Sequence, residues 1–182
     1  MFCTYLAIDR FVGAPMSVPV AWVVGLMVAL EPSAPWRGSF EKTAEAIARV
    51  SESEPLFEDK GEERTATLLV ALAWYESRFK ANVKSSNNQW YCLFQIDKRH
   101  LPDPQKALDD PEVCTRAAVK ILKASFEMCK RSKPEDRLAA FVSGACDKGL
   151  PESRYRMFLA NKLLKQHPMP AAGGGSSTAR AR

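Results

Sequence analysis

The sequence has few of the residues that metal and phosphate chemistry requires. Among 182 residues there are two histidines, His100 and His167, and neither a Cys-x-x-Cys pair nor a His-Glu-x-x-His motif occurs. A zinc site would therefore have almost no ligands. The glycines at 144 and 149 are not followed by the Gly-Lys-Ser/Thr ending of a phosphate loop. We expect neither a metal ion nor a cofactor.

Positively and negatively charged residues are nearly balanced in number. Lys and Arg number 26 against 21 Asp and Glu, so the formal net charge is +5. This is mild beside the basic stripes of nucleic-acid-binding proteins, and we expect no nucleic-acid partner. The 46% of apolar residues, with nine Phe and four Trp, is typical of a globular protein. The length allows one ordinary domain with flanking tails.

Alternating strand patterns of useful length are missing, and helical spacing dominates. We expect helices at about 40–50 after the potential cap Ser39, at 62–79, at 111–131, at 134–143 and at 151–163. Asp110-Pro111-Glu112 has the cap, first-turn proline and acidic residue of a helix start. The only place for a small hairpin is residues 81–96, where Ser85-Ser-Asn-Asn can form a turn. The fold class is mainly α.

Charged side chains are absent from residues 11–30, which divides the chain. Pro15 and Pro19 interrupt this stretch and leave an apolar run at 20–30, typical of a signal peptide. We expect residues 1–35 to be an apolar leader that serves as a signal peptide or a membrane anchor. The alternative is a buried helix packed on the domain. Residues 36–167 would form one monomeric domain, and residues 168–182, rich in Gly and Ser, a disordered tail.

Four of the five cysteines fall within residues 36–167. They are Cys92, Cys114, Cys129 and Cys146, and four cysteines allow three pairings. Cys114 and Cys129 lie on one expected helix about 22 Å apart, too far for a disulfide. If the chain is exported, we favour Cys129–Cys146, which leaves Cys92 with Cys114, over free thiols. In a cytoplasmic protein the same residues would be buried thiols.

Glu76 is the first candidate for catalysis. In the expected helix Leu68, Leu72, Tyr75 and Phe79 form one narrow apolar stripe. At about 100° per residue, Glu76 lies about 50° from the centre of that stripe, so its carboxyl group borders the buried face. Burial disfavours the charged form, and cleavage of a glycosidic bond requires a carboxylic acid that is protonated near neutral pH.

The residues around Glu76 carry a family resemblance. Glu76-Ser77 at the end of a helix, followed by Cys92-Leu-Phe-Gln-Ile96, resembles the Glu-Ser and Gly-Leu-Met-Gln-Ile motifs of soluble lytic transglycosylases, members of the lysozyme-like superfamily. Asp110-Pro111 with the helix after it resembles the next block of that domain. Residues 140–144, Ala-Phe-Val-Ser-Gly, are similar to the family's Ala-Tyr-Asn-x-Gly, and Ser153-Arg-Tyr155 to its Arg-Tyr-Val.

The resemblance implies a peptidoglycan substrate and a set of roles. Glu76 would be the only catalytic acid and base, cleaving the MurNAc-β-1,4-GlcNAc bond and forming a 1,6-anhydro-muramyl end. Ser77 would hydrogen-bond the sugar or Glu76, Gln95 would bind a sugar amide or hydroxyl, and Tyr155 would reach toward Glu76. Phe94 and Ser143 belong to the same expected substrate-binding set.

Three positions depart from the family motifs. Cys92 replaces a Gly, Phe94 a Met and Val142 an Asn, so a polar contact near Glu76 is missing unless Ser143 supplies it. A catalytically weak domain that binds wall glycan is therefore an alternative to the enzyme. A helical structural domain with accidental motifs is a further one.

A second relative suggests a different outcome for the same bond. Residues 94–100 resemble the Met-Gln-Val-Asp-Lys-Arg segment of goose-type lysozymes, in which an aspartate assists a hydrolytic water. An inverting hydrolase needs its second carboxylate ~6.5–9.5 Å from the acid, and Asp97 is the possible second carboxylate. Residues 80–93 contain no acidic side chain, so another loop aspartate is absent. This favours the one-carboxylate transglycosylase, exported to the periplasm, cell envelope or extracellular space.

Overall fold

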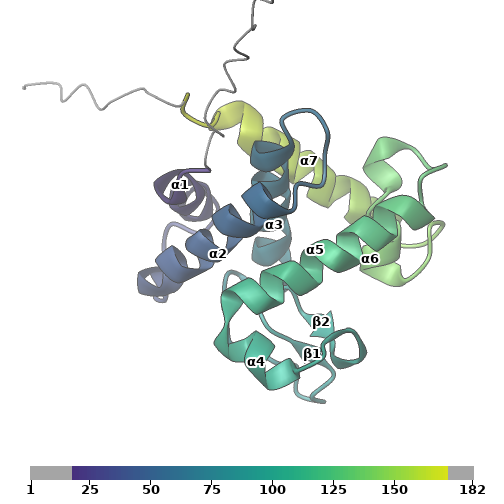
Figure 1. The fold of residues 1–182 in the computed structure, drawn as a ribbon, viewed down its shortest axis with the longest axis horizontal. Coiled ribbons are helices and arrows are strands. Elements are labelled where there is room, and N and C mark those ends of the chain that lie inside the picture. Colours follow the sequence, from purple (N-terminus) through teal and green to yellow (C-terminus); the bar gives the residue numbers. More distant parts are fainter. Residues whose placement is uncertain (1–17, 172–182) are drawn as a thin grey trace, which may run out of the picture.

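The computed structural model describes residues 18–171 of the chain. This part contains seven α-helices and one small antiparallel sheet (Figure 1). The elements are α1 (Val20–Leu30), α2 (Phe40–Ser53), α3 (Gly61–Ser77), β1 (Trp90–Tyr91), β2 (Ile96–Asp97), α4 (Pro104–Asp109), α5 (Pro111–Met128), α6 (Ala139–Ser143) and α7 (Leu150–Gln166). The mainly α fold expected from the sequence is confirmed.

The helix α3 lies at the centre of the fold. It packs against α1 and α2 on one side and against α7 on the other. Every residue from Thr65 to Ala73 is buried. The prediction that this helix buries only one narrow apolar stripe was therefore wrong. Neighbours surround α3, and a helix enclosed in this way is apolar around its whole circumference. Of the four stripe residues, Tyr75 is 39% exposed and Phe79 lies beyond the end of the helix.

The apolar run at 20–30 forms the helix α1, which packs on α2 and α3. Val23, Leu26 and Met27 are fully buried in the same core as α3. The packed unit thus begins upstream of residue 36, where we placed its boundary, and α1 has the form of the alternative, a helix buried on the domain. None of the described helices is long and apolar enough to span a bilayer. Residues 1–17, about half of the expected leader, and residues 172–182, most of the expected tail, lie outside the described residues. Cleavage of a leader stays a prediction.

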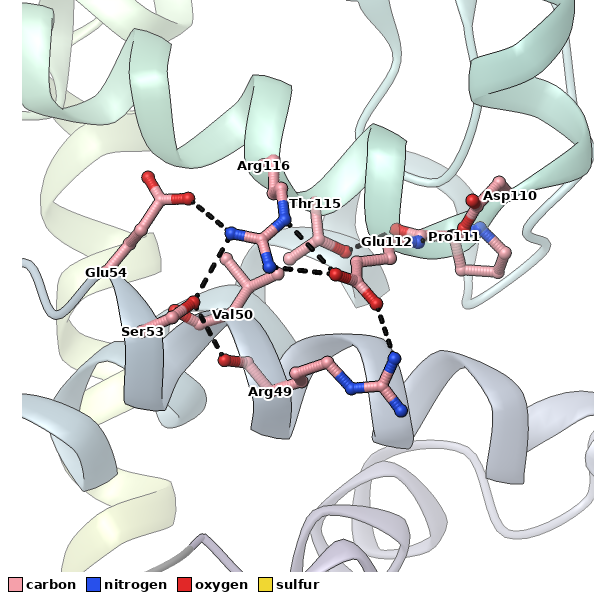
Figure 2. Close-up of polar contacts among 9 residues, drawn as sticks. All are labelled: Arg49, Val50, Ser53, Glu54, Asp110, Pro111, Glu112, Thr115 and Arg116. Carbon is pink, nitrogen blue, oxygen red and sulfur yellow. Dashed lines mark hydrogen bonds and ion pairs between the residues drawn. The ribbon is translucent and has the colours of Figure 1, made fainter. Parts of the chain in front are cut away.

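A network of ion pairs joins α2 to α5 (Figure 2). The Arg116 guanidinium donates to Glu54 of the α2 C-cap at 2.7 Å and to Glu112 on its own helix at 2.8 Å. Arg49 of α2 donates to the other oxygen of Glu112, also at 2.8 Å. These hydrogen bonds hold the pKa of Glu112 below its ordinary value. The network fixes the direction of α5, which carries one wall of the cleft described below.

The small sheet falls in the hairpin region expected at 81–96 and runs one residue beyond it, to Asp97. Trp90 pairs with Asp97 and Tyr91 with Ile96, and a further bridge joins Tyr91 to Lys84. Residues 85–88 form the expected turn between that bridge and β1, because the amide of Asn88 donates to the carbonyl of Ser85 at 2.9 Å. The chain between the two strands, residues 92–95, contributes to the cleft.

Both favoured disulfides are present. Cys92–Cys114 ties the loop between β1 and β2 to the first turn of α5, and Cys129–Cys146 ties the end of α5 to the loop after α6.

The helix ends agree only in part with those expected. The cap Asp110 accepts from the amide of Glu112 as expected, whereas α5 ends at Met128 rather than near Arg131. Ser39 precedes α2 but makes no side-chain cap, because its hydroxyl donates to the carbonyl of Trp36.

Candidate active site

Glu76 lies in the last turn of α3, where the chain leaves the core. Arg78 and Phe79 take positive φ angles of 53° and 64°, and this left-handed turn ends the helix. The amide of Arg78 bonds back to the carbonyl of Trp74, and the Phe79 ring packs edge-on against Phe40 at 5.3 Å between centroids. The helix end is therefore anchored in the core, while the Glu76 side chain keeps 22% of its surface exposed.

A cleft of about 660 Å³ opens beside Glu76. Its walls come from the end of α3, from the first half of α7, from the hairpin, from α5 and from α6. The aromatic side chains of Trp90, Phe94 and Phe141 line it, together with polar groups of Gln95, Asp97 and Ser143. An aromatic cleft with a few polar groups is typical of a ligand site.

Arg156 of α7 holds the Glu76 carboxylate. Its Nη2 donates to Glu76 Oε1 at 2.7 Å, and the guanidinium lies 4.3 Å from the centre of the Tyr75 ring. Within residues 18–171 the other oxygen, Oε2, accepts no hydrogen bond, so it is the oxygen of Glu76 that is free to bind a ligand.

The loop between β1 and β2 presents Phe94 and Gln95 to the cleft. Phe94 is buried, and the Gln95 amide donates to the carbonyls of Cys92 and Val83 at 3.0 and 3.4 Å. Cys92 and Gln95 take φ angles of 60° and 47°, in the left-handed region that favours glycine. The positive φ angle at position 92 explains why the Gly-Leu-Met-Gln-Ile motif of the family begins with glycine. This chain has a disulfide-bonded cysteine at that position instead.

Asp97 lines the same cleft but is fully engaged. Its carboxylate accepts from Arg99 Nη2 at 2.8 Å, from the Arg99 amide at 2.9 Å and from Gln89 at 3.2 Å. The side chain is 4% exposed, and the hydrogen bonds from Arg99 hold its pKa well below its usual range. A carboxylate of such low basicity is a poor general base near neutral pH.

The loop after α6 determines how Ser143 meets the cleft. The hydroxyl lies within hydrogen-bond distance of three carbonyl oxygens, those of Ala139 at 2.9 Å, Lys148 at 3.0 Å and Ala145 at 3.1 Å. Its single proton is thus used by carbonyl groups of α6 and of the loop after it. Val142 lines the cleft at the position of the family Asn and brings no polar group there.

Comparison with known families agrees with this geometry. The family model of the transglycosylase SLT domain matches residues 57–157, the segment that carries Glu76, the hairpin, α5 and the start of α7. The chain belongs to the transglycosylase SLT domain family. Neither a curated protein nor a solved structure matches it. The family resemblance inferred from the sequence motifs is confirmed.

Two of the expected site residues lie outside the cleft of this SLT domain. The Ser77 hydroxyl donates to the carbonyl of Ala73 in its own helix. Tyr155, expected to reach toward Glu76, packs against Tyr75 at 5.5 Å between ring centroids. The next residue, Arg156, contacts Glu76 instead. Neither Ser77 nor Tyr155 lines the cleft.

Sequence reasoning missed Arg156 and Trp90. A signal for Arg156 was available, because it shares one helical face with Ser153, Leu159, Ala160 and Leu163, all buried in α7. An arginine on the buried face of a helix needs a partner, and the partner is Glu76. Trp90 carried no such signal, since it follows the polar turn at 85–89. Within residues 18–171, no three His, Cys, Asp or Glu side chains are grouped as metal ligands.

Proposed function

We propose that this SLT domain is a lytic transglycosylase in which Glu76 alone serves as acid and base. The observation that carries the proposal is the contrast between the two carboxyl groups that line the cleft. Glu76 keeps Oε2 free at the edge of the cleft, whereas both oxygens of Asp97 are occupied by Arg99 and Gln89. One available carboxyl group suits a reaction that needs no second base.

The reaction then runs in two proton transfers. Glu76 donates its proton to the glycosidic oxygen of the MurNAc-β-1,4-GlcNAc bond as the bond from that oxygen to C1 of MurNAc breaks. The 6-hydroxyl oxygen of the same MurNAc forms a new bond to C1, and its proton returns to Glu76. The products are a 1,6-anhydro-muramyl end and a free GlcNAc 4-hydroxyl, and Glu76 is regenerated.

The aromatic walls suit a sugar substrate. Trp90 is 42% exposed at the cleft and Phe141 is partly buried there, so both rings can pack against the C–H faces of pyranose rings. The Gln95 amide nitrogen makes two hydrogen bonds, and among the described residues none donates to the amide oxygen, so this oxygen can accept from a sugar hydroxyl or acetamido N–H. The net charge of +5 attracts an acidic wall polymer.

A catalytically weak glycan-binding domain is the second candidate. Val142 favours it, because an apolar side chain stands where the family has Asn, and the Ser143 hydroxyl is directed to carbonyl groups of α6 and of the loop after it. Hydrolysis of goose type is less well supported, since it would assign water activation to Asp97. The two disulfides support export to the periplasm, envelope or extracellular space, where such bonds persist.

The test is the release of soluble muropeptides from purified peptidoglycan by the full chain and by Glu76→Gln. Glu152→Gln, the same charge change at an exposed position of α7, is the matched control. We expect release by the parent and by Glu152→Gln, and none by Glu76→Gln, which still sediments with peptidoglycan. Equal release by Glu76→Gln would contradict the role of Glu76. Binding without release by all three proteins would favour the glycan-binding domain.

A further inference from the structure

Arg156 is buried with an incomplete set of partners. Its side chain is 9% exposed, and Nη2 donates to Glu76, but Nε and Nη1 are buried and have no hydrogen-bond partner among the described residues. Burying a guanidinium is costly unless its charge is paired. The Glu76 carboxylate and the face of the Tyr75 ring are the two groups that compensate for it.

Arg154, two residues earlier on α7, shows the contrasting arrangement. Its guanidinium makes a forked pair with Asp136, with Nε at 2.6 Å from Oδ1 and Nη2 at 3.1 Å from Oδ2. Half of its side chain is exposed, and the pair lowers the pKa of Asp136. Arg154 joins α7 to the segment before α6, which is a structural task. Arg156 makes a single hydrogen bond, and that bond is to the candidate catalytic group.

We propose that Arg156 is a positioning residue for Glu76, an inference that rests on the proposed function. By holding Oε1, Arg156 fixes the rotation of the carboxyl group and leaves Oε2 as the oxygen that exchanges the proton with substrate. The guanidinium also interacts more strongly with Glu76 when the carboxyl group is ionised. Negative charge develops on Glu76 as its proton moves to the glycosidic oxygen, so the contact strengthens toward the transition state.

The packed rings of Tyr75 and Tyr155 support the contact between Arg156 and Glu76. The guanidinium stacks on the Tyr75 ring, and the Tyr155 ring packs edge-on against Tyr75. Because α3 carries both Glu76 and Tyr75, and α7 both Arg156 and Tyr155, the contact between the two helices sets the direction of the guanidinium. The tyrosine at 155 thus acts on the carboxyl group through Arg156 and Tyr75.

The experiment compares Arg156→Met and Arg156→Lys with the parent on a soluble glycan oligomer, and Arg154→Met is the matched control. The inference predicts that Arg156→Met lowers kcat about 10- to 100-fold, the range expected for one charged hydrogen bond, with little change in KM. Lysine restores part of kcat, because it keeps a cationic donor. Arg154→Met keeps kcat and lowers the melting temperature.

Four outcomes would overturn the inference. Arg156→Met with a parental kcat shows that Glu76 needs no such contact. A rise in KM with unchanged kcat assigns Arg156 to substrate binding. Lysine that restores nothing, in a folded variant, removes the role of the charge. If Arg156→Met does not fold, Arg156→Gln takes its place, and a parental kcat in this uncharged variant shows that the positive charge has no role at Glu76. Turnover that is lost in Glu76→Gln but parental in Arg156→Met would reject this inference alone. The proposed function would then still stand.

Discussion

Trp22 donates its indole N–H to the carbonyl oxygen of His167 at 2.9 Å, across 145 positions of the chain. The contact joins α1 to the end of α7. A second contact ties the segment after α1 to the end of α3, because Glu31 accepts from the Trp74 indole at 3.0 Å and pairs with Arg78 at 3.7 Å. The apolar run near the start of the chain is therefore continuous with the fold that holds Glu76.

Removal of residues 18–35 is expected to unfold or strongly destabilise the domain. Val23, Leu26 and Met27 are fully buried, and each such side chain contributes about 1.5–3 kcal/mol. Their sum is comparable with the total stability of about 5–15 kcal/mol of an ordinary domain. The measurement is thermal unfolding of residues 36–182 beside residues 18–182. Equal melting temperatures would show that α1 is dispensable.

Replacement of the Cys92–Cys114 disulfide offers a test of the backbone at position 92. Cys92 has a φ angle of 60°, and a residue other than glycine pays about 1–2 kcal/mol in this region. Both Cys92→Gly/Cys114→Ala and Cys92→Ala/Cys114→Ala lose the disulfide, which costs about 3 kcal/mol. We expect the glycine variant to be the more stable of the two by about 1 kcal/mol in urea unfolding. A more stable alanine variant would contradict the conformational reason for glycine in the family motif.

Asp97 is expected to contribute to stability with a defined pH dependence. Its pKa falls on folding, and a carboxyl group of this kind stabilises the fold above its unfolded pKa of about 3.9. That contribution declines as pH falls through the lower folded value. Asp97→Asn should therefore melt a few degrees below the parent at pH 7, with a difference that persists to about pH 4 and shrinks in stronger acid. Melting curves across this range check it, and identical curves at pH 7 would count against the ion pair with Arg99.

The same variant separates the two mechanisms. Since Asp97 is tied to Arg99 and Gln89, Asp97→Asn should keep kcat within about threefold of the parent on the soluble oligomer, at a temperature where both are folded. Asp103→Asn is the matched control, a helix-capping aspartate outside the cleft. Loss of turnover in Asp97→Asn but not in Asp103→Asn would make Asp97 a catalytic base.

The fold was predictable from the sequence where helical spacing and caps coincided. The cap Asp110 at the start of α5 and the end of α6 at Ser143 lie where the sequence predicted them. The run at 20–30 was ambiguous, because continuous apolar residues suit both a leader and a buried helix. Periodicity also could not show that α3 is enclosed on all sides, since the packing of α1 and α7 against it comes from distant parts of the chain.

The candidate site was predictable only in part. Glu76, Phe94 and Gln95 were found because they lie in short motifs, and the structure brings them to one cleft. Arg156 was missed because its contact with Glu76 spans 80 positions and depends on how α7 crosses α3. Tyr155 and Arg156 are neighbours in sequence, and only the rotation of α7 decides which one meets the carboxyl group.

Mass spectrometry of the muropeptides that the full chain releases from purified peptidoglycan tests both the role of Glu76 and the kind of product. We expect 1,6-anhydro-muramyl ends from the parent and from Asp97→Asn, and no products from Glu76→Gln. Reducing muramyl ends that disappear in Asp97→Asn would contradict this expectation and assign the chain a hydrolytic mechanism.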